Sequence, residues 1–188
     1  MTEYSIIGHI KKSAETIEKL ENFAPKILSI AIDLVDCLRR GGTVFWFGNG
    51  GSASDAEHLA AELSGRFAID RAPLDSLALT CNSSAITAIA NDYGFDQIFS
   101  RQVNANVRKG DVVIGISTSG SSTNVRNGLI AANRLGAVTI LLTGLNYDGD
   151  LELSHTLSVP SANTANIQEA HITIGQAICG YVELEMVV

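Results

Sequence analysis

The chain has 188 residues, the length of a single domain, and is long enough to bury a substantial core. Its composition is 46% apolar and 18% charged, with 17 Gly and 3 Pro, which excludes disordered, collagen-like and low-complexity proteins. The 13 basic and 20 acidic residues give a formal net charge of -7, so no overall basic field is available to bind nucleic acid. We therefore expect one folded domain without a nucleic-acid partner, in which local groups hold an anionic ligand.

The first residues and the cysteines indicate a cytoplasmic protein. The segment MTEYSIIGHIKK lacks the basic and apolar regions of a signal peptide, and no stretch approaches the roughly 20 apolar residues that span a bilayer. Cys37, Cys81 and Cys179 are odd in number and far apart, with no CxxC pair. We expect three reduced thiols in a protein that has no membrane partner.

The predicted elements begin with two helices. Apolar residues near helical spacing predict a helix over 2–21, and Pro25, in a first-turn position, opens a second helix that ends at Arg40. Short apolar or β-branched runs then alternate with segments of helical length. We predict strands at 43–47, 76–79, 111–116, 137–143 and 155–159, and helices at 53–67, 84–106 with a break near Gly94, 123–135 and 165–186.

Strands separated by helices indicate βαβ units with right-handed crossovers. The expected fold is α/β: a doubly wound, mostly parallel five-stranded sheet with helices on both faces. No repeat or linker is evident, so we predict one domain over 1–188, with a helical pair in 1–41 and the α/β core and long C-terminal helix in 42–188. Ligands of such sheets bind beyond the carboxyl ends of the strands, so the loops after strands are the candidate sites.

The first of these loops, FGNGGSASDAEH, is rich in glycine. Gly48, Gly50 and Gly51 allow a tight turn, and Ser52 with Asp55 has the spacing of a capping box that opens a helix. A helix N-terminus offers N–H groups and a positive dipole end to an anion. The loop lacks the third glycine of the dinucleotide-binding motif and the lysine of a P-loop. A tight turn with only a structural role is the alternative interpretation.

The second loop, ISTSGSSTN over 116–124, places six hydroxyl groups within seven residues beside a glycine. Hydroxyl and amide donors suit a phosphate, and they lack the charge that would hold a product too tightly. Both loops fall on the same edge of the predicted sheet, which favours a phosphate site there. A serine-rich loop with an N-cap is the alternative.

His58 and Glu62 lie four residues apart on the helix that follows the first loop, so they share one face. The pair can present an imidazole and a carboxylate to one metal ion or one substrate. A solvated or salt-bridged surface pair is the alternative. The functional interpretation is favoured because this helix begins at the predicted phosphate loop.

Five segments together carry a family resemblance: GNGGSASDAEHLAAELSGRF at 48–67, ANDYGF at 90–95, GDVVIGISTSGSS at 110–122, LLTG at 141–144 and VPSANTANIQEAHITIG at 159–175. In this order, and over most of the chain, they resemble the phosphoheptose isomerases of the sugar-isomerase (SIS) domain superfamily. The resemblance implies a flavodoxin-like fold, a homotetramer and conversion of sedoheptulose 7-phosphate to D-glycero-D-manno-heptose 7-phosphate. That reaction begins the synthesis of bacterial heptose precursors for lipopolysaccharide, capsule or other glycans.

The resemblance also implies a set of site residues. Substrate contacts would fall on Asn49, Gly50, Gly51, Ser52, Asn91, Asp92, Ser117, Thr118, Ser119, Ser122 and Gln168. Ligands of a zinc ion would fall on His58, Glu62, Gln168 and Gln176. The catalytic positions would fall on Glu62 and Gln176.

At position 176 the sequence departs from the family. The family pattern IQExHxxxxH ends in histidine, where this chain has Gln176. By the resemblance, the missing histidine is both a zinc ligand and the second acid/base group. Glu62 can move a proton between adjacent carbons through an enediol, whereas glutamine can only exchange hydrogen bonds. Zinc prefers imidazole, thiolate or carboxylate, so we expect lower zinc affinity, and Glu62 cannot readily be both a tight ligand and a free base.

The neighbouring histidine does not replace the missing one. His171 lies five residues before Gln176, a net rotation of about 140°, so it projects from another side of the helix and is expected to be structural. Gln168 and Gln176 are about 12 Å apart along the helix and can flank one site. Three arginines in loops or at helix ends are expected to be solvated or ion-paired: Arg66, Arg71 and Arg101.

Three interpretations of Gln176 follow. The protein is a working isomerase with Glu62 as its main base, or residue 176 was altered deliberately in an otherwise ordinary isomerase. Alternatively, the protein is a non-catalytic relative that binds phosphosugars or a protein partner, as one replication-initiation regulator of the superfamily does. The presence of both His58 and Glu62 counts against the last interpretation, because a binding module has no evident need of a general base. Isomerisation of another phosphosugar also stays open.

Overall fold

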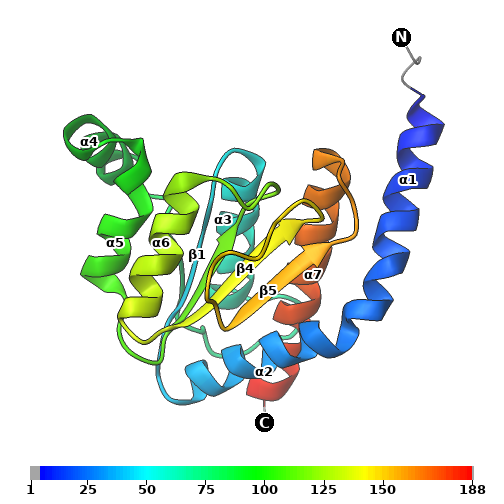
Figure 1. The fold of residues 1–188 in the computed structure, drawn as a ribbon. Coiled ribbons are helices and arrows are strands. Elements are labelled where there is room, and N and C mark those ends of the chain that lie inside the picture. The colour runs from blue at the N-terminus through cyan, green and yellow to red at the C-terminus, as the bar shows by residue number, and fades with distance from the viewer. Residues whose placement is uncertain (1–4, 188) are drawn as a thin grey trace.

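The computed structural model describes residues 5–187 and contains a five-stranded, all-parallel sheet (Figure 1). The strands pair in the order β2-β1-β3-β4-β5, which is the flavodoxin-like doubly wound order. The predicted fold class is confirmed. The strands are β1 (Val44–Gly48), β2 (Ser76–Ala78), β3 (Val112–Ile116), β4 (Val138–Gly144) and β5 (His155–Val159).

The predicted helices are also confirmed, within one or two residues at most ends. The break predicted near Gly94 separates two helices, and the predicted start of the first helix includes residues 2–4, which lie outside the described residues. The α-helices are α1 (Ile6–Glu18), α2 (Ala24–Arg39), α3 (Gly51–Ser64), α4 (Ser83–Tyr93), α5 (Ile98–Asn106), α6 (Thr123–Arg134) and α7 (Thr164–Met186), with 3-10 turns η1 (Lys19–Phe23) and η2 (Phe95–Gln97).

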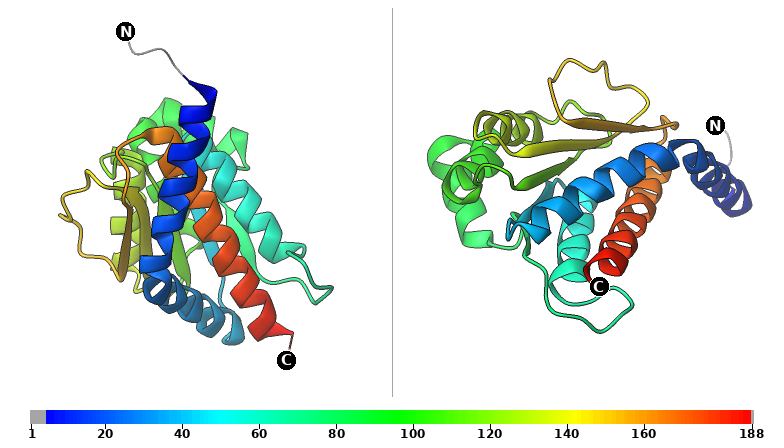
Figure 2. Two further views of the ribbon diagram at one scale, coloured as in Figure 1. Left: turned by 90° about the vertical axis from the view of Figure 1, so that its right-hand side faces the viewer. Right: turned by 90° about the horizontal axis from the view of Figure 1, so that it is seen from below.

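Helices cover both faces of the sheet because successive side chains of a strand point to opposite faces. Val44 and Trp46 of β1 pack in the core beneath α2, α3 and α7, whereas Phe45 and Phe47 pack in the core beneath α5 and α6 (Figures 1 and 2). All five residues of β1 are buried, so the strand shows no alternation of polar and apolar residues. Trp46 Nε1 donates to Ser76 Oγ at 2.9 Å and secures the short edge strand β2.

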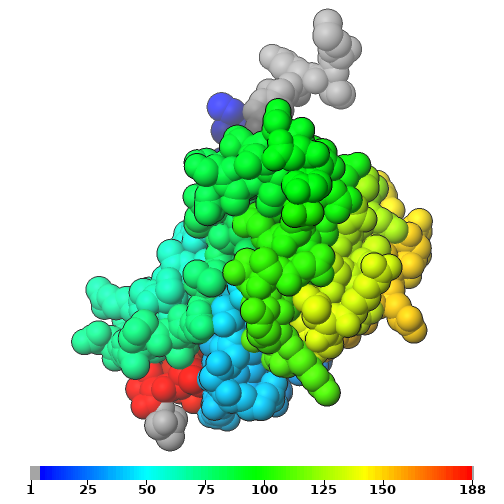
Figure 3. Space-filling view, turned by 90° about the vertical axis from the view of Figure 1, so that its left-hand side faces the viewer, coloured from blue at the N-terminus to red at the C-terminus, as the bar shows by residue number. Residues whose placement is uncertain are grey.

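Two helices extend away from this core. Helix α1 packs along α7 and keeps Ile6, Ile7 and Ile10 exposed by 71%, 67% and 60%. Helix α4 contains no buried residue and forms a knob at the top of the face seen in Figure 3. Among residues 5–187, no helix has the length and hydropathy needed to cross a bilayer.

The strand order places the topological switch point of the sheet between β1 and β3. The connections after these two neighbouring strands lead to opposite faces of the sheet, α3 on one and α6 on the other. Their loops diverge at the carboxyl ends of the strands, which is where ligands of doubly wound sheets bind. Both loops singled out in the sequence lie at this point.

Candidate active site

The glycine-rich loop leads directly into α3. The N-cap of α3 is Gly50, with φ of 56°, and the helix begins at Gly51. The predicted capping box is wrong: Ser52 lies inside the first turn, only 3% exposed, and no side chain caps the helix. Helix α3 begins two residues earlier than the spacing of Ser52 and Asp55 indicated, because the chain enters the helix through Gly50, which has a positive φ.

A pair of amides joins the two loops. Asn49 Nδ2 donates to Asn124 Oδ1 at 2.8 Å, and Asn124 Nδ2 donates back to Asn49 Oδ1 at 2.9 Å. Asn124 is 2% exposed, and its Oδ1 also accepts from the N–H of Val125 at 2.9 Å. Sequence reasoning did not assign a role to Asn124, although it ends the serine-rich segment. The pair fixes the glycine-rich loop against the start of α6.

The serine-rich loop is folded by its own hydroxyl groups. Ser117 donates to Ser122 Oγ at 3.0 Å and accepts from the N–H of Gly120 at 3.2 Å. Ser119 is exposed and accepts from Ser121. A cavity of about 140 Å³ opens beside the loop and is lined by Thr118, Ser119, Leu145, Asn146, Ser161, Ala162, Thr164 and Ile167.

That cavity is smaller than the roughly 300–1,000 Å³ typical of a site that encloses a whole ligand. Hydroxyl groups from Thr118 and Ser119 on one side and from Ser161 and Thr164 on the other suit a phosphoryl group. The rest of a longer substrate must therefore extend outside it.

The predicted reactive pair lies on α3. His58 Nε2 and Glu62 Oε1 are 2.8 Å apart, and the two side chains are 48% and 18% exposed. Asp55 lies one turn before His58 on the same face, and its Oδ2 has no hydrogen-bond partner among the described residues. Burial raises the pKa of Asp55, opposed by the charge of His58. Sequence reasoning assigned Asp55 to the cap and missed its spacing of three and seven residues from His58 and Glu62.

Helix α7 lies beside α3 (Figure 2). Residues early in α7 contact residues early in α3, and later residues of α7 contact later residues of α3. A β-carbon added at Gly51 would lie 2.6 Å from Gln168 Nε2, and one added at Gly175 would lie 2.3 Å from Leu59 Cδ1. Further on, Cys179 Sγ lies 3.9 Å from the carbonyl oxygen of Leu59. The two helices therefore run parallel, with Gln168 beside the start of α3.

This register separates the two glutamines. Gln176 follows Gly175 and so lies at the level of Leu59, next to the turn that carries His58 and Glu62. Gln168 lies beside Gly51, which precedes Glu62 by eleven residues, about 16 Å along α3. Within one chain, the structure brings Gln176 to the level of the reactive pair and leaves Gln168 at the glycine-rich loop.

Asn91 and Asp92 lie apart from the other predicted site residues. Both are exposed on α4, and Asn91 Nδ2 donates to Asp92 Oδ1 at 2.8 Å. The contacts of α4 are with η2 and α5, on the far side of the sheet from α3 and α7. Their role as substrate contacts stays a prediction.

The remaining titratable groups of this region are structural. His171 is fully buried, Nε2 lies 3.1 Å from the carbonyl oxygen of Thr143, and burial lowers its pKa to about 4. This confirms the prediction that His171 is a structural residue of the helix packing. The three cysteines are free, and burial raises the pKa of Cys37 to about 11 and of Cys179 to about 12, so both are unreactive thiols.

The three arginines are exposed or ion-paired, as predicted. Arg71 forms a buried ion pair with Glu183, and Arg101 lies over the ring of Tyr93, 3.6 Å from its centroid. Arg66 is exposed in the loop after α3. None of the three contacts the serine-rich loop in the described part of the chain.

Comparison with known proteins adds to this geometry. The profile of the SIS domain family matches residues 8–144. The phosphoheptose isomerase of Aquifex aeolicus is 50% identical over 179 residues, 94% of this chain and 93% of that protein. That of Rhodospirillum rubrum is 47% identical over 182 residues, 96% and 97% of the two chains. The chain belongs to the phosphoheptose isomerase family of SIS domains.

A solved structure of the family agrees with the fold. The phosphoheptose isomerase of Neisseria gonorrhoeae superposes with a TM-score of 0.87 at 40% identity, covering 95% of this chain and 97% of that chain. Members of this family are aldose–ketose isomerases that act on a small molecule. The chain is therefore an aldose–ketose isomerase with a small-molecule substrate.

The zinc ion expected from the family pattern fits these residues poorly. His58 and Glu62 supply one imidazole and one carboxylate, whereas Gln168 and Gln176 supply only amide oxygens, and Gln168 lies two turns away. Within residues 5–187, no three His, Cys, Asp or Glu side chains gather to hold a metal ion.

Proposed function

We propose that this protein interconverts sedoheptulose 7-phosphate and D-glycero-D-manno-heptose 7-phosphate, the first step of bacterial heptose precursor synthesis. The observation that carries the proposal is the 2.8 Å pair of His58 and Glu62 on α3, at the level of Gln176 on the neighbouring helix α7. Identity of about 50% with phosphoheptose isomerases over almost the whole chain supports the same reaction.

Glu62 acts as the base. The carboxylate removes a proton from C1 of the ketose, the C–H electron pair forms the C1=C2 double bond, and the oxygen on C2 takes a proton from solvent water to give the enediol. Glu62 then returns its proton to C2, while the hydroxyl on C1 gives its proton back to solvent and becomes the aldehyde. His58 Nε2 orients the carboxylate from 2.8 Å. Gln176 can donate a hydrogen bond to a developing oxygen charge but cannot move a proton.

The phosphate end binds at the serine-rich loop. Ser117, Thr118, Ser119 and Ser122 surround the start of α6, whose N-terminus favours an anion, and the cavity beside them admits a phosphoryl group. The sugar then extends over Asn49 to Ser52 and Gln168, with Asn91 and Asp92 as further contacts.

We propose that this protein binds zinc only weakly. His58 and Glu62 would hold it, with amide oxygens of Gln176 and Gln168 as the weaker donors, and the reaction above includes no step through the ion. A tightly bound zinc would compete with the base function of Glu62.

The working form is proposed to be a cytoplasmic homotetramer. The exposed apolar face of α1, formed by Ile6, Ile7 and Ile10, is the kind of surface that subunit contacts cover. Heptose made by the enzyme would feed lipopolysaccharide, capsule or other glycans.

Turnover of sedoheptulose 7-phosphate by the purified protein, with and without zinc, tests the proposal beside Glu62→Gln and Gln176→His. Turnover by the unmodified chain that is lost in Glu62→Gln supports isomerisation with Glu62 as base. Activity in Gln176→His alone indicates an isomerase scaffold disabled at one position.

A second candidate function is that of a non-catalytic phosphosugar-binding protein. Gln176 favours it, because a glutamine side chain has no titratable group. Binding of the phosphosugar without turnover in all three proteins would support that candidate.

A further inference from the structure

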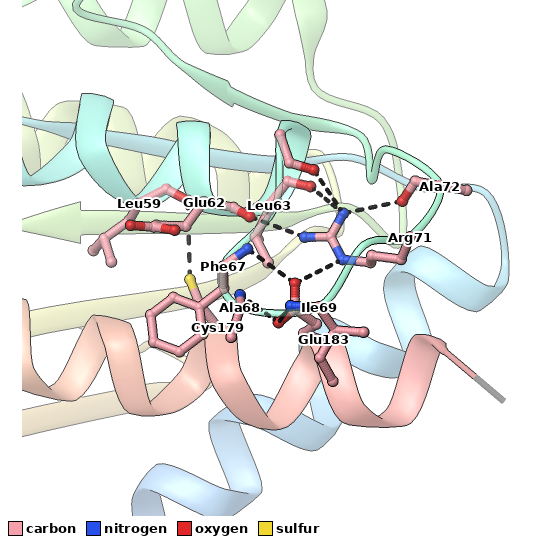
Figure 4. Close-up of polar contacts among 11 residues, drawn as sticks. Leu59, Glu62, Leu63, Phe67, Ala68, Ile69, Arg71, Ala72, Cys179 and Glu183 are labelled. Carbon is pink, nitrogen blue, oxygen red and sulfur yellow. Dashed lines mark hydrogen bonds and ion pairs between the residues drawn. The ribbon is translucent and has the colours of Figure 1, made fainter.

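A buried charged pair lies at the end of the α3–α7 contact (Figure 4). Arg71, in the loop after α3, and Glu183, on α7, have side chains that are 3% and 1% exposed, and Arg71 Nε lies 3.3 Å from Glu183 Oε1. Burial of two charges is costly unless their other polar atoms find partners. The partners of each side chain show what the pair holds together.

Arg71 closes the C-terminal end of α3. Its Nη2 donates to the carbonyl oxygen of Glu62 at 2.9 Å, and its Nη1 donates to those of Leu63, Gly65 and Ala72 at 2.9, 3.2 and 3.0 Å. Helices leave their last carbonyl groups unpaired and carry a negative dipole end there, so a guanidinium is a suitable cap. One cation therefore fixes the turn that carries the catalytic carboxylate.

Glu183 fixes the loop that presents Arg71. Its two oxygens accept from the N–H groups of Phe67, Ala68 and Ile69 at 2.9, 2.7 and 2.8 Å. Burial opposes ionisation of this carboxyl, but the three N–H donors together with Arg71 lower its pKa. A loop with mostly exposed side chains is thereby bonded to α7 through its backbone.

The pair also sets the height of α3 along α7. Glu183 lies seven residues after Gln176, about two turns or 10 Å, and so on nearly the same helix face. Between these two levels, Cys179 fills the contact with Leu59. A continuous connection therefore runs from Gln176 along α7 to Glu183, across to Arg71 and back to the backbone of Glu62.

We propose that Arg71 and Glu183 are positioning residues for the isomerisation, which hold the Glu62 turn at a fixed distance from Gln176 on α7. This inference rests on the proposed function in that it takes Glu62 as the base. Misplacement of a catalytic group by about 1 Å can cost roughly 100-fold in rate. The phosphate site lies on the β3–α6 loop, outside this connection, so substrate binding does not depend on it.

Two variants test the inference by the split between kcat and KM. Arg71→Lys keeps the positive charge but cannot reach four carbonyl groups, and Glu183→Gln removes the negative charge with little change of shape. We expect kcat to fall roughly 10- to 100-fold while KM for sedoheptulose 7-phosphate stays within about twofold. An unchanged kcat in both folded variants would overturn the inference.

Two controls separate positioning from loss of stability. Val103→Ala, in the core on the opposite face, lowers the melting temperature without touching the pair, and Arg39→Met removes an exposed ion pair with Glu185 near the same end of α7. Both controls should keep kcat. An equal loss of kcat in Val103→Ala at a matched melting temperature would show a general stability effect and refute positioning.

Backbone amide exchange gives a readout that is independent of activity. Exchange over 61–72 should be faster in Arg71→Lys and Glu183→Gln than in the unmodified protein, because the cap and loop bonds are lost. Unchanged exchange would refute the connection. If the unmodified protein fails to isomerise the sugar phosphate, the proposed function falls, and faster exchange in the variants still supports the mechanical link between Arg71, Glu183 and the Glu62 turn.

Discussion

Gly51 at the start of α3 leaves the space that the side chain of Gln168 occupies, since a β-carbon at residue 51 would lie 2.6 Å from Gln168 Nε2. The contact brings the glycine-rich loop after β1 against the C-terminal helix, 117 residues further along the chain. The same register brings Gly175 against Leu59, and so places Gln176 at the level of His58 and Glu62. Helix α7 thus lies against α3 from the glycine-rich loop to the turn that carries His58 and Glu62.

Loss of the base should abolish isomerisation. In Glu62→Gln we expect kcat to fall roughly 100- to 10,000-fold, because an amide cannot accept the proton from C1. Binding of the sugar phosphate, measured by calorimetry, should change little, since the phosphate loop is intact. Retention of more than a tenth of the activity would assign the base to another group, of which Asp55 on the same face is the first to test.

A histidine at position 176 should raise zinc affinity. Gln176→His adds an imidazole at the level of His58 and Glu62, and we expect at least about tenfold tighter zinc binding in a chelator competition assay. Gln176→Asn, which keeps the amide, is the matched control and should bind as the unmodified protein does. Equal affinity in Gln176→His would mean that residue 176 does not face His58 and Glu62.

The phosphate site is tested by removal of one exposed hydroxyl. In Ser119→Ala we expect the dissociation constant of inorganic phosphate and the KM for the sugar phosphate to rise roughly tenfold, as for loss of a hydrogen bond to a charged group. Ser29→Ala, an exposed serine on α2, should change neither. A fall in kcat with unchanged KM would contradict a binding role for Ser119.

Close contact between α3 and α7 predicts a sharp response to one added methyl group. Gly175→Ala places a carbon 2.3 Å from Leu59 Cδ1, so we expect a loss of about 1–3 kcal/mol in the free energy of unfolding, and about 2–4 °C in melting temperature per kcal/mol. Gly180→Ala, on the same helix with its nearest neighbour at 3.3 Å, should be neutral or slightly stabilising. If α3 and α7 are further apart than this, Gly175→Ala should have a free energy of unfolding no lower than that of Gly180→Ala.

Acid should destabilise the protein through His171. Its pKa is about 4 when folded, because burial disfavours the charged ring, and near 6.5 when unfolded. Between these values the unfolded chain binds more protons, so the free energy of unfolding falls as the pH falls from 6.5 to 4, by up to about 3 kcal/mol. Urea unfolding of His171→Gln, which keeps a donor for the carbonyl of Thr143, should show a flatter pH dependence over this range.

Local patterns determined much of this protein. The alternation of short apolar runs with helical segments specified the five strands and the helices, because strands buried on both faces need little more than β-branched and aromatic residues, as in β1. The i, i+4 spacing of His58 and Glu62 was sufficient to place them together, since a helix converts that spacing into proximity. The hydroxyl groups of residues 117–123 likewise lie close together because they belong to one short loop.

Other relationships depended on contacts between distant segments. The start of α3 at Gly51 overrode the spacing of Ser52 and Asp55, because a positive φ at Gly50 set the entry of the helix. The Asn49–Asn124 pair, the level of Gln176 beside α3 and the Arg71–Glu183 connection join residues 75, 117 and 112 positions apart. Sequence spacing carries no information on such pairs: they exist because the sheet order places β1 beside β3, and because side-chain packing fixes how far α7 slides along α3.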